Sequence, residues 1–441
     1  MLDPVAKPLR LRNWARNESS SPHRCATPPD VEALRELLRD AAAEGRSVKV
    51  GGALHSWSAA AMTSGVSVSL DRISSLREID RTRGEATVDG GMRLHEINAA
   101  LDAEGLALPI LGSIAQQSVA GAIATGTHGS SLHHGNLASG VTGLEILDAA
   151  GQRRWLDRDD PLLDAARVGL GALGIVTGVR LKVCPAFRLR ETLTRLPFEA
   201  GLEQLEELAR EASYLKIWWL PPHDELLAFR YEPTDAPSTL GRVGPWFDEK
   251  LVNPHVFRAL LWAGGKVPAL VPSINRVVHR LRFAPAERVG PSAAMFTLAM
   301  PPRHRECEFA LPLARASEAL RTMHAIVKRE GLRLNFIQEL RFVRGDAGWM
   351  SPAYGGDTAQ LGAYMAASPE LETYFGQFEA AMRELGGRPH WGKEFRSFDA
   401  HEVRRCWPKA REFTEMVHAW DPEGRFENPF LRRILGPREG G

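Results

Sequence analysis

The sequence predicts an α+β protein of more than one domain, for three reasons. Residues 1–185 alternate amphipathic helices with short strands that run into glycine-rich loops. From 186 to about 390 the strands and helices are longer, a pattern typical of helices packed on an antiparallel sheet. The 441 residues suffice for two or three domains. We expect one domain at 1–185, a second at 186–390, and a C-terminal segment, 391–441, that packs back onto the first.

The elements expected within 1–185 follow from capping residues, turns and periodicity. The first helix should begin after Asp30, because aspartate caps helix N-termini, and should end at Gly45. Ala150-Gly151 should form the turn of a hairpin. The other helices are expected at 94–104 and 161–167, and the strands at 47–50, 66–70, 86–88, 143–149, 152–156 and 175–183.

The second domain should contain an amphipathic helix near 312–330 and an alternating strand at 335–342. Glu339 and Arg341 are two residues apart, so both side chains point to one face of that strand. An acid and a base so placed in an apolar strand form either an exposed ion pair or a buried functional pair. The strand pattern alone favours the exposed ion pair.

Composition excludes several classes of protein. The chain has 55 Lys and Arg against 54 Asp and Glu, so its net charge of +1 provides no protein-wide field for binding nucleic acid. Its four cysteines contain no CxxC spacing, which argues against a disulfide framework and against a zinc site. The N-terminal residues 1–17 lack the apolar run of a signal peptide. We therefore expect a cytoplasmic protein.

The stretch 254–283 is the most membrane-like part of the chain, since it is apolar and basic. Lys266, Pro268 and Pro272 interrupt it before it reaches the roughly 18–20 uncharged apolar residues that a membrane span requires. It is compatible with an amphipathic segment at a membrane surface or with two short helices on the protein surface. We favour the second interpretation and expect no membrane association.

Two patterns that resemble binding motifs fail on their context. Gly169–Gly174 fits GxGxxG, but a helix-like segment precedes it and the strand Ile175–Thr177 follows, whereas a dinucleotide site needs strand, loop and helix in that order. We expect a helix-to-strand turn there. His128, His133 and His134 lack carboxylate or cysteine partners at ligand spacing, so no metal site is predicted.

Glycine supplies 40 of the 441 residues, and two of its clusters carry most of the information on function. Gly51–Ser56 and Ser118–Ser130 each combine small residues, hydroxyl groups and a histidine. Consecutive backbone N–H groups in such loops can bind phosphate without a charged side chain. Either loop alone is equally compatible with a tight turn in the core. Two such loops in one domain indicate a large phosphorylated cofactor.

Together with the turn and strand Ala172–Thr177, these loops resemble the FAD-binding domain of the vanillyl-alcohol-oxidase-type flavoproteins, in particular the branch of sugar-1,4-lactone oxidases and alditol oxidases. The resemblance covers nearly the whole chain and is faintest from about 200 to 300. It also rests on Asn13-Trp14-Ala15, Trp349–Tyr354, Arg388–Lys393, Asp421–Phe426 and Asn428. It implies an FAD-binding domain of two subdomains and a cap domain in which helices cover an antiparallel sheet.

The resemblance implies how FAD is held. The histidine of the first loop is typically bonded covalently to the flavin 8α carbon in this family, which makes His55 the expected attachment point. The residue before it is often glycine and here is Leu54, which is costly if that position requires a positive φ. The implied FAD contacts are Gly51, Gly52, Ala53, Leu54, His55, Ser56, Ser118, Gly121, Thr125, Gly126, His128, Gly129, Ile175 and Asn428.

The resemblance also implies a catalytic group and reverses the interpretation of the strand pair. Arg341 would stabilise negative charge that develops on the flavin, and Glu339 would accept hydrogen bonds from substrate hydroxyls. Lys393 matches a lysine that helps to deprotonate the reacting hydroxyl if burial lowers its pKa. Ser113 matches a serine near substrate and flavin. Gly112 matches a gate beside the flavin, where a small residue admits O₂.

These expectations describe an FAD-dependent oxidase that acts on a sugar lactone or a related polyhydroxylated alcohol and produces hydrogen peroxide, with O₂ and this small substrate as its partners. The apolar stretch Leu361–Met365 suits a lactone better than a linear polyol. The alternatives are an alditol oxidase, an oxidase of a secondary alcohol on a glycosylated natural product, a dye- or cytochrome-linked dehydrogenase, and a non-catalytic flavin-fold protein. The oligomeric state is not predicted.

Overall fold

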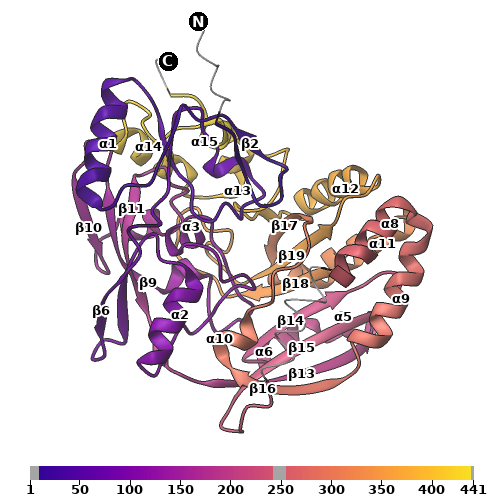
Figure 1. Cartoon of the computed structure of the whole chain (residues 1–441). Helices are drawn as coiled ribbons and strands as arrows, with labels where there is room; N and C mark the ends of the chain where they lie inside the picture. Colours follow the sequence, from indigo (N-terminus) through magenta and orange to yellow (C-terminus); the bar gives the residue numbers. More distant parts are fainter. Residues whose placement is uncertain (1–8, 242–254, 439–441) are drawn as a thin grey trace, which may run out of the picture.

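The computed structural model describes residues 9–241 and 255–438. The N-terminal elements, from indigo to violet, lie on one side of the molecule, and a large sheet lies on the other (Figure 1). The C-terminal helices, in yellow, return to the N-terminal side (Figure 1).

A small parallel sheet and a larger antiparallel one form the N-terminal part. The small sheet has the order β3-β5-β4, with β3 at Arg24–Ala26, β4 at Val48–Val50 and β5 at Val66–Val68. The larger sheet has the order β10-β9-β11-β7-β6, in which all neighbours are antiparallel. Its strands are β6 (Leu76–Asp80), β7 (Glu85–Asp89), β9 (Val141–Leu147), β10 (Arg153–Asp157) and β11 (Ile175–Lys182).

Helices and short strands complete this part. The helices are α1 (Val31–Ala43), α2 (Leu94–Ala103), α3 (Val119–Ala124) and α4 (Leu163–Arg167), with single 3₁₀ turns η1 (Ala59–Ala61) and η2 (Leu137–Gly140). Two further pairs are β1 (Leu11–Arg12) with β2 (Ser19–Ser20), and β8 (Leu106–Ala107) with β12 (Cys184–Pro185).

The large sheet has eight antiparallel strands in the order β16-β13-β15-β14-β18-β19-β17-β20. The strands are β13 (Arg188–Pro197), β14 (Tyr214–Trp219), β15 (Glu225–Thr234), β16 (Ala286–Pro291), β17 (Arg305–Pro312), β18 (Gln338–Val343), β19 (Thr358–Met365) and β20 (Arg388–Pro389). Its helices are α5 (Phe198–Glu203), α6 (Leu205–Glu211), α8 (Arg258–Lys266), η4 (Pro268–Leu270), α9 (Val271–Arg282), α10 (Ser292–Phe296), η5 (Leu313–Arg315), α11 (Ala316–Arg329) and α12 (Leu371–Glu384).

The C-terminal helices are α13 (Ala400–Cys406), α14 (Ala410–Trp420) and α15 (Pro429–Leu435). They contact the N-terminal part through backbone and side-chain hydrogen bonds. The amide of Val48 donates to the carbonyl of Arg425 at 2.7 Å, and the Asn428 side chain donates to the carbonyls of Ala60 and Met62 at 3.0 and 2.9 Å.

One continuous hydrophobic core joins the two larger sheets. Val88 and Leu144 of the five-stranded sheet belong to the same cluster of buried residues as Phe309 and Leu361 of the eight-stranded sheet. The sheets are therefore packed into one body, and the face between them is where loops from both can meet.

Predictions based on caps and turns are confirmed. Helix α1 begins after Asp30, whose carboxylate accepts a hydrogen bond from the amide of Ala33 at 2.8 Å, and Gly45 follows its end with φ of 63°. Strands β9 and β10 form the expected hairpin. Gly169–Gly174 connects α4 to β11, so the order needed for a dinucleotide site is absent, as expected.

Two details concern the second half of the chain. The strand expected at 335–342 begins at Gln338, because the Asn335 side chain, instead of its backbone, accepts from the amide of Ala366 at 3.0 Å. The stretch 254–283 forms the expected pair of short helices, α8 and α9, apart from residue 254, which lies outside the described residues. Among the helices in the described part of the chain, none has both the length and the apolar character to span a membrane.

Candidate active site

Two adjoining cavities lie where the parts of the fold meet. The larger has a volume of about 1380 Å³ and the smaller about 120 Å³. The two share part of their walls, which consists of His55, Ser56, Gln117 and Thr125. A ligand that is longer than either cavity can therefore reach from one into the other.

The smaller cavity is enclosed by the two glycine-rich loops and by the turn before β11. Backbone segments approach closely here, since a Cβ on Gly52 would lie 2.1 Å from the Ser118 hydroxyl oxygen and a Cβ on Gly90 would lie 2.1 Å from the carbonyl of Val176. The expected FAD contacts that line this cavity are Gly52, Ala53, Leu54, His55, Ser56, Ser118, Gly121, Thr125 and Ile175. Of the other expected contacts, His128 lines the larger cavity, and Gly51, Gly126, Gly129 and Asn428 line neither.

Leu54 has a left-handed backbone conformation, with φ of 53°. This is the conformation in which glycine is the residue without steric cost. Its carbonyl accepts a hydrogen bond from the amide of Trp14 at 2.8 Å, which helps to hold the strained residue in place. The sequence-based concern about this position therefore has a structural basis.

His55 follows directly and lies at the junction of the two cavities. Its ring lies 6.0 Å from that of Trp14, measured between centroids. Burial, with a smaller effect of the Arg93 charge, lowers the pKa of His55 to about 4. Its imidazole is therefore neutral at physiological pH and retains a nitrogen lone pair.

Glu339 and Arg341 of β18 form a buried pair at the wall of the larger cavity. The Arg341 guanidinium donates to the Glu339 carboxylate at 2.5 Å and to the Ser113 hydroxyl at 2.8 Å. The Glu339 side chain is only 4% exposed and that of Arg341 13%. The interpretation from the strand pattern alone, an exposed ion pair, is wrong, because loops of the N-terminal part cover this face of the sheet.

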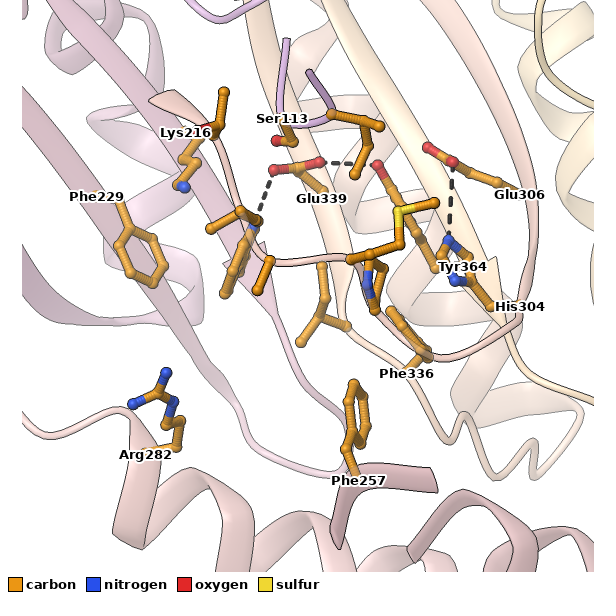
Figure 2. Close-up of a pocket in the computed structure, with 18 of the residues that line it drawn as sticks. Ser113, Lys216, Phe229, Phe257, Arg282, His304, Glu306, Phe336, Glu339 and Tyr364 are labelled. Carbon is orange, nitrogen blue, oxygen red and sulfur yellow. Dashed lines mark hydrogen bonds and ion pairs between the residues drawn. The ribbon is translucent and has the colours of Figure 1, made fainter. Parts of the chain in front are cut away.

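Two further donors fix the Glu339 carboxylate. The indole of Trp218 donates to it at 2.7 Å and the hydroxyl of Tyr364 at 2.8 Å (Figure 2). Burial by itself would raise the pKa of Glu339, but the neighbouring charges of Arg341 and Lys216 and these donors hold it below its usual value. Glu339 is therefore an ionised hydrogen-bond acceptor at the cavity wall.

Lys393 also lines the larger cavity and is paired with carboxylates of β17. Its ammonium contacts the Glu306 carboxylate and lies 3.8 Å from that of Glu308. Burial raises the pKa of Glu306. Burial alone would also raise the pKa of Glu308, but the charges of His128 and Lys393 hold it well below its usual value.

His128 is part of the same group, which the spacing of residues in the sequence did not reveal. Its Nδ1 lies 2.8 Å from the carbonyl of Gly129 and its Nε2 lies 2.6 Å from the Glu308 carboxylate. Both ring nitrogens thus face acceptors, so the ring satisfies both only as an imidazolium that donates twice. The carboxylate partner that the sequence lacked near His128 comes from a residue 180 positions away.

Potential metal ligands converge at two places in the described part of the chain. The ligating atoms of His128, Glu308 and His390 lie within 4.8 Å of one another, as do those of His223, Glu225 and His279. In the first group, the ring of His390 accepts from the amide of Gly392 at 3.0 Å, and burial lowers its pKa to about 3. Each residue of this first group therefore already takes part in a hydrogen bond within the protein.

Lys216 of β14 is a cavity residue that the sequence analysis missed. Its ammonium is buried and lies 4.9, 5.0 and 5.2 Å from the ring centroids of Trp218, Phe229 and Tyr231. Burial lowers its pKa to about 8, although the charge of Glu339 acts in the opposite direction. Nothing in the pattern Tyr214–Trp219 distinguishes this lysine from one that reaches solvent.

Glu306 and Glu308 were also missed, but here a signal was available. They are two residues apart in an otherwise apolar strand, as Glu339 and Arg341 are, and this alternation places both on one face. The five expected catalytic residues, by contrast, are all found together. The larger cavity is lined by Gly112, Ser113, Glu339, Arg341 and Lys393.

Comparison with known proteins identifies the family. Residues 179–434 match the family model of D-arabinono-1,4-lactone oxidase, and residues 22–157 match that of an FAD-binding domain. The chain is 30% identical to L-gulonolactone oxidase from Scyliorhinus torazame, over 97% of this chain and 98% of that relative. The chain belongs to the D-arabinono-1,4-lactone oxidase family.

Other members and a solved structure agree with this assignment. This chain is 29% identical to L-gulono-1,4-lactone dehydrogenase from Mycobacterium tuberculosis, over 96% of this chain and 99% of the relative. Cholesterol oxidase from B. sterolicum has the same fold, with a TM-score of 0.83 at 15% identity over 97% of this chain and 96% of that one. The expected resemblance to the vanillyl-alcohol-oxidase type and the expected fold class are confirmed.

The residues of this lactone oxidase family chain fit FAD. The lining of the smaller cavity includes Gly52, Gly90, Gly91, Gly121 and Gly171, and a lining with few side chains lets backbone N–H groups approach a diphosphate. The larger cavity adjoins it and has Arg341 at its wall, which suits the electron-accepting ring. The expectation of FAD as cofactor is confirmed.

Proposed function

We propose that this protein is an FAD-dependent oxidase of a sugar 1,4-lactone. The observation that carries the proposal is the convergence of Ser113, Glu339, Arg341 and Lys393 on one cavity beside the FAD loops. These residues come from three distant parts of the chain, and the family match covers them all except Ser113, which lies within the FAD-binding match. The lactone oxidases and the dehydrogenase named above support the class of substrate.

FAD, when bound, accepts the two electrons and the hydrogen of a carbon–hydrogen bond beside a hydroxyl group, and O₂ reoxidises it with release of hydrogen peroxide. Gly52, Ser118 and Thr125 would hold its diphosphate part, and His55 would be its covalent attachment point. The neutral imidazole of His55 supports this last role, because a protonated ring would have no lone pair with which to form the bond.

Arg341 and Glu339 would orient the substrate and balance charge. The Arg341 guanidinium is fixed by Ser113 and Glu339, so it is preorganised to face negative charge that develops in the cavity. The ionised Glu339 has the capacity to accept from sugar hydroxyls in addition to its present donors. A lactone without several hydroxyl groups would leave this remaining acceptor capacity of the Glu339 carboxylate unused.

Lys393 and Glu306 would take part in removing the proton of the reacting hydroxyl. The Lys393 ammonium is in contact with the Glu306 carboxylate. The pKa of Glu306 is raised, so this carboxylate is a stronger base toward a hydroxyl proton than an ordinary one. This differs from the sequence-based hypothesis that burial alone activates the lysine. We assign the accepting role to the pair, in which Lys393 positions the hydroxyl and Glu306 accepts the proton.

Gly112 supports O₂ as the acceptor, since it is the smallest residue and lines the cavity next to Ser113. A cytoplasmic location remains a proposal.

The test is anaerobic mixing of the purified holoenzyme with L-gulono-1,4-lactone or D-arabinono-1,4-lactone, with a linear alditol as the control. We expect bleaching of the yellow flavin by a lactone, recovery on admission of air, and one hydrogen peroxide per lactone oxidised. Bleaching by the alditol alone would contradict the lactone class. Bleaching by a lactone without recovery in air would show a dehydrogenase.

A further inference from the structure

The larger cavity has two chemically different halves. At one end Ser113, Glu339, Tyr364 and Glu306 form a polar group, and at the other Phe229 and Phe257 face the open space (Figure 2). The polar end is the one that adjoins the FAD loops, through His55 and Gln117. The reaction assigned to this protein requires only that end.

The other half is built by the cap and is predominantly apolar. Helices α8, α9 and α10 and the strands β13 and β15 supply its walls. Residues that represent this wall are Leu261, Val271, Ile274, Val278, Phe283 and Met295. Of these residues, Ile274 and Val278 are partly exposed. Exposed apolar surface costs free energy in proportion to its area unless a ligand covers it.

Three polar groups of the apolar half are already engaged, and Arg282 also lines this half (Figure 2). The Arg288 guanidinium donates to the Glu191 carboxylate at 2.5 and 2.9 Å. Asn275 donates to the carbonyls of Pro221 and Leu334 at 2.6 and 2.8 Å. The Lys216 ammonium faces three aromatic rings. A second polyhydroxylated ring would find few partners there, whereas a hydrocarbon group would cover the wall.

The dimensions point the same way. The cavity of about 1380 Å³ exceeds the roughly 300–1,000 Å³ of pockets that hold drug-sized ligands. A six-carbon lactone is much smaller than such a ligand, and the flavin ring would occupy only the end near His55 and Gly112. Val277 and Leu281 both line the cavity while being 57% and 77% exposed, so the apolar wall continues to the surface. An extended group could therefore lie along α9 to the mouth.

We infer that the substrate is amphipathic: a polyhydroxylated lactone or sugar head that carries an apolar tail, joined as an ester or glycoside. The head reacts at Glu339, Arg341 and Lys393, and the tail lies in the apolar half against α9. The inference rests on the proposed function for the identity of the head. It adds the class of the tail, which no lactone in the names of the relatives contains.

The experiment compares two esters of one lactone, 6-O-acetyl- and 6-O-octanoyl-L-gulono-1,4-lactone, by kcat/KM with the holoenzyme. Burial of one methylene is worth about a three- to fourfold change in binding, so two buried methylenes give roughly a tenfold gain. We expect kcat/KM for the octanoyl ester to exceed that for the acetyl ester by at least this factor. Equal values, or a lower value for the octanoyl ester, would overturn the inference.

Substitutions on α9 locate the tail. Ile274→Trp and Val278→Trp fill the apolar half and should remove the gain from chain length while activity on the acetyl ester persists. Ser273 is exposed, lies on the same helix and does not line the cavity, so Ser273→Trp is the matched control and should retain the gain. A gain that survives both filling variants would place the tail elsewhere and overturn the assignment.

A binding measurement separates the two proposals if no lactone reacts. The holoenzyme is titrated with n-octyl β-D-glucopyranoside, below its critical micelle concentration, and separately with methyl β-D-glucopyranoside. Binding is followed by the change in flavin absorbance. Tighter binding of the octyl compound by at least about tenfold, lost in Val278→Trp, supports the apolar subsite even when the lactone oxidase activity fails. Equal binding of both glycosides refutes it.

Discussion

At Leu54 we expect a glycine variant to be more stable than an alanine variant, which is the reverse of the usual order of stability. At an ordinary position in a loop or element, glycine is less stabilising than alanine by about 0.5–1 kcal/mol, because glycine loses more backbone entropy on folding. Leu54 has φ of 53°, where a residue with a Cβ costs about 1–2 kcal/mol. We therefore expect Leu54→Gly to be more stable than Leu54→Ala by about 0.5–1 kcal/mol.

Comparing these two variants with each other removes the contribution of the leucine side chain. The side chain of Leu54 is half-buried and packs toward Gly51, where an added Cβ would lie 2.9 Å from its Cδ2. Both variants lose this contact equally, so the difference between them reports the backbone alone. The chain also offers a neighbouring control, because Ala53 is in the same loop and has no positive φ.

The assay is thermal unfolding of the wild-type holoenzyme and the three variant holoenzymes at one saturating FAD concentration, since bound cofactor itself raises the midpoint. The midpoint temperature of unfolding should be higher for Leu54→Gly than for Leu54→Ala, and lower for Ala53→Gly than for the wild type. If Leu54→Gly unfolds below Leu54→Ala, the left-handed strain at this position does not exist. Acid precipitation of the same samples measures flavin bonded to His55, and we expect the bonded fraction in Leu54→Gly to equal or exceed that of the wild type.

Three further predictions concern the cavity. Arg341→Lys keeps the charge but loses the planar guanidinium, whose Nη2 donates to Ser113 and Glu339 and whose Nη1 donates to the His128 carbonyl. Flavin bleaching by lactone should therefore slow by at least about tenfold, toward the ~10²-fold typical of a lost transition-state donor. Stopped-flow rates equal to wild type would contradict this role. Gly112→Ala places a Cβ 3.1 Å from the Thr127 methyl carbon and 3.2 Å from the His128 carbonyl, and should slow recovery of flavin colour in air more than recovery with an artificial dye; equal slowing would contradict the gate. The pKa of Lys216, about 8, lies below the unfolded value near 10.4, so the unfolded state binds more protons between these pH values and wild-type stability should gain about 2 kcal/mol from this group between pH 8 and 9.5; Lys216→Met should lack this gain in unfolding curves at the two pH values.

The sequence predicted local features well because single residues determine them. Asp30 and Gly45 define α1, and Ala150-Gly151 defines the β9–β10 hairpin, since caps and turns depend on neighbours in the chain. The glycine-rich loops indicated a phosphorylated cofactor, because close backbone approach requires glycine. The resemblance to the family singled out Leu54, since the residue before the histidine is often glycine there.

Burial could not be predicted in this way. The strand around Glu339 and Arg341 has the same pattern whether solvent or a loop covers its face, and only the resemblance to a family distinguished the two. The loops around Ser113 and His128 cover that face, through contacts between residues more than 200 positions apart. Lys216 is the extreme case, because two of its three cation–π contacts are with Phe229 and Tyr231 of the neighbouring strand β15.

The ion pairs of the larger cavity hold together the chain segments that form its walls. Each buried carboxylate has a cationic partner, and two of these pairs join segments that the sequence assigns to different parts of the chain. Glu308 of β17 pairs with His128 of the second glycine-rich loop, and Glu306 pairs with Lys393 of the C-terminal segment. Removal of one partner leaves a buried charge uncompensated, which typically costs about 3–5 kcal/mol.

The third pair lies within β18 but depends on the same arrangement. Arg341 donates both to Glu339 and to Ser113, which lies in the expected FAD-binding part. All three expected segments, 1–185, 186–390 and 391–441, therefore contribute a charged or polar group to one cavity. The common hydrophobic core between the two larger sheets provides the rigidity that these pairs require. A fragment that ends at 185 or begins at 186 would contain buried charges without partners, so the site can form only in the complete assembly of the three segments.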